Sequence, residues 1–237
     1  MRIPPVLGPS SGRRTFLLTL AAGLVDVVRH PAWGLTPVVV EDWRGMPVGS
    51  RGIPPGWRKY ETPGGHPEYD FRLIDDGGRS ALDLRSAGDH ATIAKEVFVD
   101  LRATPIVQWQ WKVVSQPVAA DLRNKAASDA TGHLFLIWPR FPELLRSRLI
   151  GYVWDATLPV GSIVRSPKTS MVTFIVVRSG GHGVGEWAEE QRDVLADYRA
   201  IFAESISDLR AVALSIDTND TRSRAETMFV RITFNPR

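Results

Sequence analysis

Side chains that carry oxygen atoms gather near the end of the chain, in the run Asp217-Thr218-Asn219-Asp220-Thr221. Several carboxylate and carbonyl oxygens in a tight loop are what a hard cation such as Ca²⁺ requires. Asp217, Asn219 and Asp220 are therefore candidate Ca²⁺ ligands. The run is shorter than an EF-hand loop and lacks its glycine and terminal glutamate. Asp and Asn also stabilise turns by bonding to their own backbone, so a turn is favoured over a metal site.

A second charged set consists of Asp121, Lys125 and Asp129, which are spaced by four residues. On a helix this spacing would place them on one face as ion pairs. In a loop they would line a polar pocket, where they are candidate ligand-binding residues. The surrounding stretch, 119–131, is polar and shows little periodicity, so we expect a long loop that returns over one sheet face. A solvated charged loop without a ligand is an equally good interpretation.

Four tryptophans lie on or at the ends of predicted strands: Trp109, Trp111, Trp138 and Trp154. A row of indoles on an open face would bind sugar rings, whose C–H faces stack on aromatic rings. Tryptophan on the apolar side of a half-buried strand is more often part of the core, and this is the favoured interpretation of Trp109 and Trp111. Trp154 stands beside an aspartate at a strand end. We expect it at the rim, as a candidate ligand contact.

Arg192 and Asp193 belong to a predicted helix and are further candidates for ligand binding. Asp193 and Asp197 have like charges at helical spacing, which costs a little stability unless a cation lies between them. Arg192 would pair with an acid from a neighbouring loop. We expect these residues mainly to fix the helix to the rest of the domain, with a role in a site second.

Catalytic motifs are scarce. The histidines show no spacing typical of zinc sites, and there is no G-x-S-x-G motif. The glycine-rich run 179–185 follows no βα unit and has no Walker lysine, so it is interpreted as a flexible loop. The chain has no cysteine, which excludes disulfides and thiolate chemistry. Carboxylate pairs for glycoside hydrolysis could be assembled from the many acids, but the sequence does not select two.

The elements that must position these residues are mainly strands. In 106–114, Val107, Trp109, Trp111 and Val113 alternate with polar residues, which predicts a strand. Alternation on both sides of an Asp-Asp-Gly-Gly turn predicts a hairpin over 69–85. Further strands are predicted at 93–99, 133–138, 149–154, 172–179, 209–216 and 227–234. Apolar residues recur at helical spacing only in Glu189–Glu204, which predicts one helix.

Many short strands with one helix indicate an all-β, mainly antiparallel fold, namely a jelly-roll-like β-sandwich of the galactose-binding or carbohydrate-module kind. We expect this single domain over 69–237. Residues 35–68 are rich in proline and glycine and are expected to form a linker and lead-in, anchored by Trp43 and Trp57.

The N-terminus resembles an export signal over 1–34. Arg13, Arg14, Phe16 and Leu17 match the twin-arginine pattern, and the apolar run that follows is too short to span a bilayer. This predicts a periplasmic or extracellular protein, whereas an unprocessed amphipathic helix would leave it cytoplasmic. The formal net charge of +3 comes entirely from this segment. The neutral remainder has no basic face for nucleic acid.

A series of short motifs in a fixed order resembles the bacterial domain of unknown function 3047 over about Pro54 to Phe234. The motifs are Trp109-Gln110-Trp111-Lys112-Val113, Asp121-Leu122-Arg123-Asn124-Lys125, Tyr152-Val153-Trp154, Ser179-Gly180, Trp187, Gln191-Arg192-Asp193-Val194, Asp197-Tyr198 and Asp217-Thr218-Asn219-Asp220-Thr221. The acidic pair of the resembled family is Ser128-Asp129 here, and positions 219 and 220 are exchanged. Since that family has no assigned activity, the resemblance implies a family relationship but does not indicate a catalytic activity.

Three functions follow as hypotheses. The first is an exported, non-catalytic module that binds a glycan or another polar ligand of the cell envelope. The second is a carboxylate-dependent carbohydrate hydrolase or lyase on the same scaffold. The third is a structural partner in an envelope assembly, which predicts an exposed apolar patch in place of a concave polar pocket.

Overall fold

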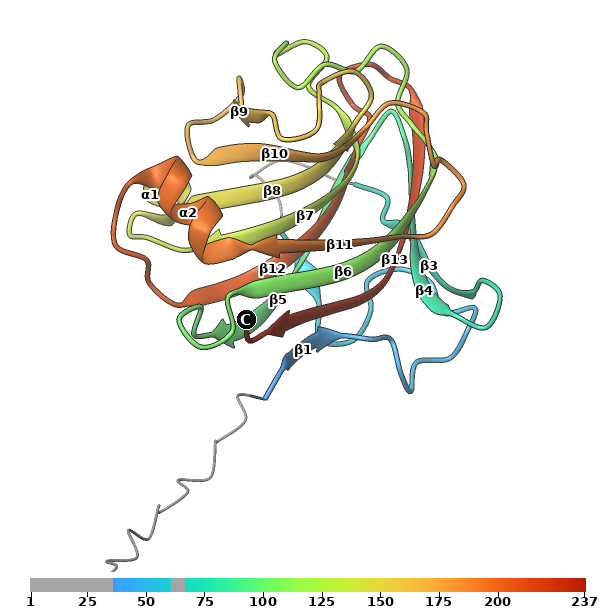
Figure 1. Cartoon of the computed structure of the whole chain (residues 1–237). Coiled ribbons are helices and arrows are strands. Elements are labelled where there is room, and N and C mark those ends of the chain that lie inside the picture. Colours follow the sequence, from blue (N-terminus) through green and yellow to red (C-terminus); the bar gives the residue numbers. More distant parts are fainter. Residues whose placement is uncertain (1–35, 61–66) are drawn as a thin grey trace, which may run out of the picture. The chain divides into compact units, whose positions relative to one another are not determined.

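The computed structural model describes residues 36–60 and 67–237, which belong to one compact unit, Leu35–Arg237. Two sheets pack against each other, and a short helix lies beside β11 at one end (Figure 1). The expected all-β class is confirmed: the fold is a β-sandwich with mainly antiparallel pairing. The exception is a parallel pair formed by β8 and β10.

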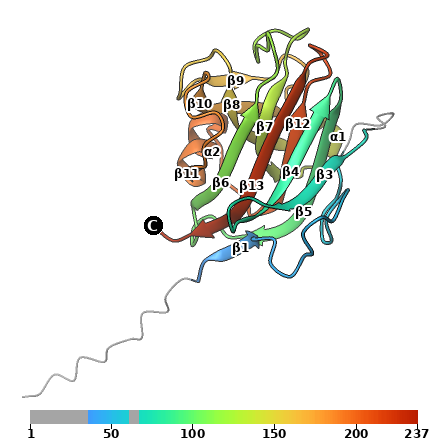
Figure 2. The ribbon, with the colours of Figure 1, turned by 90° about the vertical axis from the view of Figure 1, so that its right-hand side faces the viewer.

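The first sheet, sheet A, has six strands in the order β11-β6-β13-β4-β3, with β1 paired to β13. Figure 2 looks onto its outer face, where β6, β13, β4 and β3 lie side by side. The bounds are β1 Val38–Glu41, β3 Asp70–Asp75, β4 Ser80–Ala87, β6 Ile106–Ser115, β11 Ala188–Asp193 and β13 Arg224–Asn235.

The second sheet, sheet B, has seven strands in the order β2-β5-β12-β7-β8-β10-β9. Their bounds are β2 Arg58–Lys59, β5 His90–Val99, β7 Ala130–Trp138, β8 Arg148–Asp155, β9 Ile163–Arg165, β10 Val172–Ser179 and β12 Leu209–Asp217. All the strands predicted from alternation are present, because their apolar side chains face the space between the sheets.

Tryptophan and tyrosine rings fill the centre of that space. Trp109 and Trp111 of β6 are 1% and 0% exposed, as the alternation predicted. Trp109 stacks on Tyr152 of β8, with ring centroids 5.3 Å apart, and Trp111 lies 5.9 Å from Trp154. Rings of this size bury large apolar areas, so these contacts hold the two sheets together.

The predicted helix Glu189–Glu204 is shorter than expected, and its first part is a strand. Residues 188–193 form β11, which pairs antiparallel with β6 along that edge of sheet A. The helix α2 spans Val194–Phe202, starts at the N-cap Asp193 and ends at Ala203 in a left-handed conformation. Pairing with β6 therefore overrides the helical spacing. A second helix, α1, spans Glu143–Arg146.

The proline- and glycine-rich segment is more than a linker, because it contributes β1 to sheet A and β2 to sheet B. Its two tryptophans act as the predicted anchors: Trp43 and Trp57 are 1% and 6% exposed and stack 5.8 Å apart. The indole nitrogen of Trp43 donates to the carbonyl oxygen of Phe229 on β13 at 2.8 Å. The predicted export signal lies outside the described residues. In the part of the chain that is described, no helix has the length and apolar character needed to cross a bilayer.

Candidate functional site

Two of the acidic motifs meet at one end of sheet B. The Asp129 carboxylate, which is 0% exposed, accepts hydrogen bonds from the backbone of Asp220 at 3.1 Å and of Thr221 at 2.8 Å. The Thr221 hydroxyl donates a third bond at 2.6 Å. Asp129 therefore organises the turn 217–221 from a distant part of the chain. Sequence spacing alone could not show this meeting, because 91 residues separate Asp129 from Asp220 along the chain.

A lysine lies beside this turn and contacts two of its carboxylates. The Lys168 ammonium lies 2.5 Å from Asp220 Oδ2 and 3.8 Å from Asp217 Oδ2. The backbone N–H of Asn219 donates to Asp217 Oδ1 at 3.3 Å, as in a turn that bonds to itself. Among the described residues, no three His, Cys, Asp or Glu side chains are arranged to hold a metal ion. The proposed Ca²⁺ ligands Asp217, Asn219 and Asp220 thus form a turn neutralised by Lys168.

Burial sets the electrostatics of this cluster. It raises the pKa of Asp217 to about 8, and the neighbouring Asp129 adds to the effect. Burial also acts on Asp129, but the hydrogen bonds from Thr221 and Asp220 outweigh it and lower the pKa of that carboxyl. His133, which is 3% exposed, has a pKa lowered to about 3 by burial. These groups are shielded from solvent, so they stabilise one end of the sandwich more readily than they contact a ligand.

The other predicted ligand contacts do not join Asp129. Asp121 pairs with its near neighbour Arg123 at 2.9 Å, and Lys125 is exposed. The expectation that Trp154 lies at the rim is wrong, because its ring is 1% exposed. The indole nitrogen donates to the carbonyl oxygen of Gly180 at 2.9 Å, so the turn after β10 covers this strand end.

Arg192 and Asp193 fix the N-terminal end of α2, and the acid that pairs with Arg192 belongs to α2 itself and not, as expected, to a neighbouring loop. Arg192 bonds both oxygens of Asp197, at 2.5 and 3.0 Å, and the buried Tyr152 hydroxyl donates to Asp197 at 2.8 Å. The Asp193 carboxylate accepts from the backbone of Ala196 at 3.0 Å and pairs with Arg237 at 2.8 Å. Asp193 is therefore an N-cap, a role that typically contributes about 1 kcal/mol. Neither residue lines a hollow described below.

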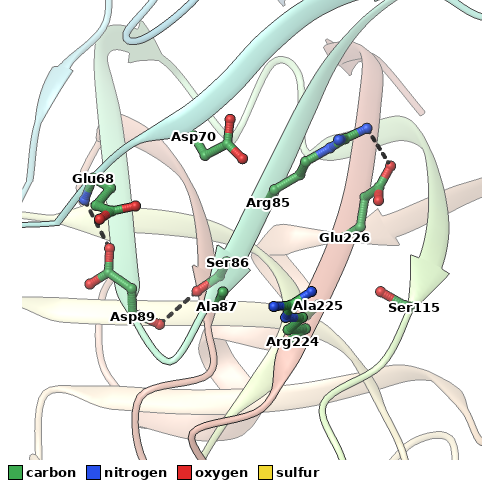
Figure 3. Close-up of a pocket in the computed structure, with 10 residues that line it drawn as sticks. All are labelled: Glu68, Asp70, Arg85, Ser86, Ala87, Asp89, Ser115, Arg224, Ala225 and Glu226. Carbon is green, nitrogen blue, oxygen red and sulfur yellow. Dashed lines mark hydrogen bonds and ion pairs between the residues drawn. The ribbon is translucent and has the colours of Figure 1, made fainter.

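One hollow of about 320 Å³ lies on the outer face of sheet A. Figure 3 shows Glu68, Asp70 and Asp89 around it, with Arg85 reaching Glu226. Its lining residues are Glu68, Asp70, Arg85, Ser86, Ala87, Asp89, Ser115, Arg224, Ala225 and Glu226. Among these charges, Arg85 bonds Glu226 at 3.1 Å, and it also bonds the buried Asp83 beneath the hollow at 2.9 Å. None of these lining residues is aromatic.

A second hollow, of about 490 Å³, lies on the outer face of sheet B, and we call it the aromatic groove. Its floor includes Ala94, Ala211 and Ile137, three side chains that point away from the main core. Its sides include Arg58, Tyr60, Glu96, Phe98, Pro139, Glu143, Ser147 and Arg210. Small floor side chains leave room above the sheet, and the longer side chains at the edges enclose that room.

Two aromatic side chains of the groove are open to solvent: Tyr60 is 40% exposed and Phe98 is 60% exposed. The guanidinium of Arg210 lies 4.7 Å from the centre of the Phe98 ring, a cation–π contact that holds the ring in place. Arg58 and Glu96 form an ion pair at 2.7 Å across β2 and β5. None of these residues belongs to a motif that can be recognised in the sequence. The signal was present at Phe98, which follows Glu96 on the outward side of β5.

The sequence matches the model of one protein family, described as protein of unknown function (DUF3047), over residues 55–233. The chain belongs to the DUF3047 family. The resemblance seen in the short motifs is thereby confirmed. A search of curated proteins finds no match to this DUF3047 chain.

Solved structures with a similar strand arrangement share little sequence with the DUF3047 chain. The family 11 carbohydrate-binding module of cellulase Lic26A-Cel5E from Clostridium thermocellum is 8% identical, with a TM-score of 0.46, over 85% of this chain and 95% of that one. The xyloglucanase domain of NopAA from Sinorhizobium fredii, solved with cellobiose, is 8% identical, with a TM-score of 0.44, over 80% and 96%. The family 30 carbohydrate-binding module of cellulase Cel9D-Cel44B from C. thermocellum is 8% identical, with a TM-score of 0.44, over 85% and 98%. Sequence identities and TM-scores this low support no conclusion about the function of this chain.

Proposed function

We propose that this DUF3047 chain is an exported, non-catalytic module that binds a glycan in the aromatic groove. One observation carries the proposal. Among the large hydrophobic side chains that are exposed in the described residues, the aromatic ones are Tyr60, Phe98 and Phe141. Tyr60 and Phe98 line the groove, and Phe141 lies in the chain between the lining residues Pro139 and Glu143. Two of these three exposed aromatic side chains therefore line a single hollow.

The chemistry of the groove suits a sugar. The ring of a pyranose presents apolar C–H groups on its faces and hydroxyls at its edge. The exposed faces of Tyr60 and Phe98 offer apolar surfaces on which these C–H groups can stack. Arg58, Glu96 and Glu143 offer hydrogen-bond donors and acceptors for the sugar hydroxyls. A concave apolar site with a few polar groups at its edges is the usual form of a small-ligand pocket.

Export is part of the proposal and rests on the sequence. The twin-arginine pattern at Arg13 and Arg14, followed by a short apolar run, supports delivery to the periplasm or the outside of the cell. That route carries folded proteins, which suits a domain whose lead-in must pair with both sheets before the fold is complete. Glycans of the envelope or the surroundings would be accessible there.

The alternative of a carboxylate-dependent enzyme requires a suitably perturbed acid within the groove. Burial raises the pKa of Asp83 to about 6 and that of Asp217 to about 8, and neither residue lines the groove. In the groove itself, Glu96 is paired with Arg58. The geometry therefore supports binding better than turnover.

The test is affinity electrophoresis and thermal unfolding against a panel of polysaccharides, using the wild type, Phe98→Ala and Tyr60→Ala. A ligand at a hundredfold excess over its Kd stabilises the folded state by about 2.7 kcal/mol, so binding should raise the midpoint clearly. Each aromatic truncation should weaken binding about tenfold or more. Val118→Ala is the control, because Val118 is 74% exposed and lies outside the groove. Equal binding by Phe98→Ala, Tyr60→Ala and the control would reject the groove as the site.

A further inference from the structure

We propose that the aromatic groove takes an internal stretch of an uncharged, linear glycan chain and discriminates against acidic and amino sugars. The inference rests on the proposed function and names the class of ligand for the same groove. Two independent features carry it: the separation of the backbone positions of Tyr60 and Phe98 along the direction of β5, and the balance of charge around them.

The separation follows from the register of the strands. The backbone N–H of Tyr60 donates to the carbonyl oxygen of Thr92 at 3.0 Å, which places Tyr60 beside Thr92 on β5. Phe98 lies six residues further along the same strand. At a rise of about 3.3 Å per residue, the two positions are roughly 20 Å apart. That backbone span exceeds the length of one sugar ring several times, and we expect a ligand that contacts both aromatic side chains to be an extended chain.

The floor between the two rings is compatible with such a chain. Thr92, Ala94, Glu96 and Phe98 alternate onto the outer face of β5, and Ala211 on β12 pairs opposite Glu96. Ala94 and Ala211 are 2% and 8% exposed and carry only a methyl group each. Ala94 and Ala211 therefore present no large side chain to a linear ligand, whereas the Arg58–Glu96 pair from the same part of the sheet offers polar partners to its hydroxyls.

The charges around the groove are balanced, and the side chains of Arg58, Glu96 and Arg210 are already engaged. Two arginines, Arg58 and Arg210, face two glutamates, Glu96 and Glu143, among the lining residues. Arg58 is held by Glu96 at 2.7 Å, and the Arg210 guanidinium lies over the Phe98 ring at 4.7 Å. A uronate or sulfate would have to draw an arginine out of one of these contacts, and an ammonium would compete for Glu96. An uncharged sugar needs neither exchange, since its hydroxyls can bond to the outward lone pairs and N–H groups of the existing pairs.

Arg210 has a positioning role in this arrangement. Its cation–π contact covers one face of the Phe98 ring, while the side chain of Phe98 remains 60% exposed. Removal of the guanidinium should free the ring to rotate. The loss should therefore appear in the binding of long chains, which need both aromatic contacts, more than in the binding of short ones.

The experiment is isothermal titration calorimetry of the full chain with two sets of probes. The first set is neutral cello-, xylo-, manno- and laminari-oligosaccharides from disaccharide to hexasaccharide. The second is oligogalacturonate, oligoalginate and chitosan oligosaccharides, and both sets are titrated at low and high salt. We expect binding by at least one neutral series, an affinity that rises with chain length to a plateau, and little dependence on salt. Phe98→Ala and Arg210→Ala should remove most of the gain from length, and Val118→Ala should not.

The outcomes separate the two proposals. Preferred binding of a charged series with a steep salt dependence would overturn the inference about charge and leave a glycan-binding protein. Equal affinity for a disaccharide and a hexasaccharide would overturn the inference about an extended chain in the same way. Absence of heat with every probe, confirmed by an unchanged unfolding midpoint, would overturn the proposed function itself.

Discussion

The substitution Asp217→Asn should change how the stability of the protein depends on pH. Burial raises the pKa of Asp217 from an ordinary value near 3.8 to about 8, so this side chain is protonated in the folded protein and ionised in the unfolded chain between those limits. Asp217 is 8% exposed, which leaves little solvent to screen the effect. An asparagine amide has the shape of the protonated carboxyl and, like it, can donate a hydrogen bond to Asp129.

The sign and size follow from linkage. A group whose pKa is raised on folding binds its proton more tightly in the folded state, so its contribution to stability is complete below the unfolded pKa and is lost as the pH rises through about 8. The slope for one such proton is roughly 1 kcal/mol per pH unit or slightly more. Between pH 5 and pH 7, the free energy of unfolding of Asp217→Asn should therefore rise by about 2 kcal/mol relative to the wild type.

Urea unfolding at pH 5, 6, 7 and 8 measures this difference directly. Asp193→Asn is the matched control, because asparagine also caps a helix and the pKa of Asp193 is lowered: burial opposes this shift, but the bonds to Arg237 and Ala196 outweigh burial. The control should differ from the wild type by a constant amount over this pH range. If the Asp217→Asn curve also runs parallel to the wild type, the carboxyl is not held in its protonated form and the account of this cluster is wrong.

Three further predictions concern other parts of the fold. Gly151→Ala should destabilise the protein by about 1–3 kcal/mol, since a Cβ there would lie 2.7 Å from Phe135 Cε1 and 3.0 Å from Phe174 Cδ1; an unchanged thermal midpoint would contradict this. His133→Leu should unfold at a lower pH than the wild type. Burial lowers the pKa of His133 to about 3, so below about pH 6.5 the histidine binds a proton in the unfolded chain but not in the folded protein, and acid favours unfolding. Coincident acid-unfolding curves of the two proteins would refute this. Arg192→Met should cost about 2 kcal/mol in urea unfolding, because it leaves the Asp197 carboxylate, 12% exposed, without its guanidinium; Arg192→Lys should recover part of this loss, and a full loss in both would point to packing instead of charge.

The strands could be predicted because each depends on a local pattern. In β6, alternation alone identifies the side that packs against Tyr152 and Trp154. The start of α2 could not be predicted in this way, since residues 188–193 become a strand only through pairing with β6, which lies far away in the sequence. The burial of Trp154 could not be predicted for the same reason. The turn at Gly180 covers the end of its strand, and no feature of the sequence near Trp154 indicates this contact.

The acidic cluster was predicted in part. Asp129, Asp217 and Asp220 were chosen separately as chemically suggestive residues, and the structure brings them together. Their neutralisation by Lys168 was not foreseen, because Lys168 comes from the β9–β10 loop and has no motif of its own. The aromatic groove was missed for a related reason. Tyr60 lies in a segment interpreted as a linker, and Phe98 is a single aromatic residue on the polar side of its strand.

The residues that carry the family resemblance are mostly those that build the scaffold. Trp109 and Trp111 fill the core, and Arg192 and Asp197 fix α2 to the buried Tyr152. None of the motif residues lines the aromatic groove. Membership in the DUF3047 family therefore predicts the β-sandwich fold, whereas the aromatic groove is formed by side chains outside the family motifs. A member with small aliphatic residues in place of Tyr60 and Phe98 would keep the fold and lose both stacking surfaces, so the ligand has to be determined on this chain itself.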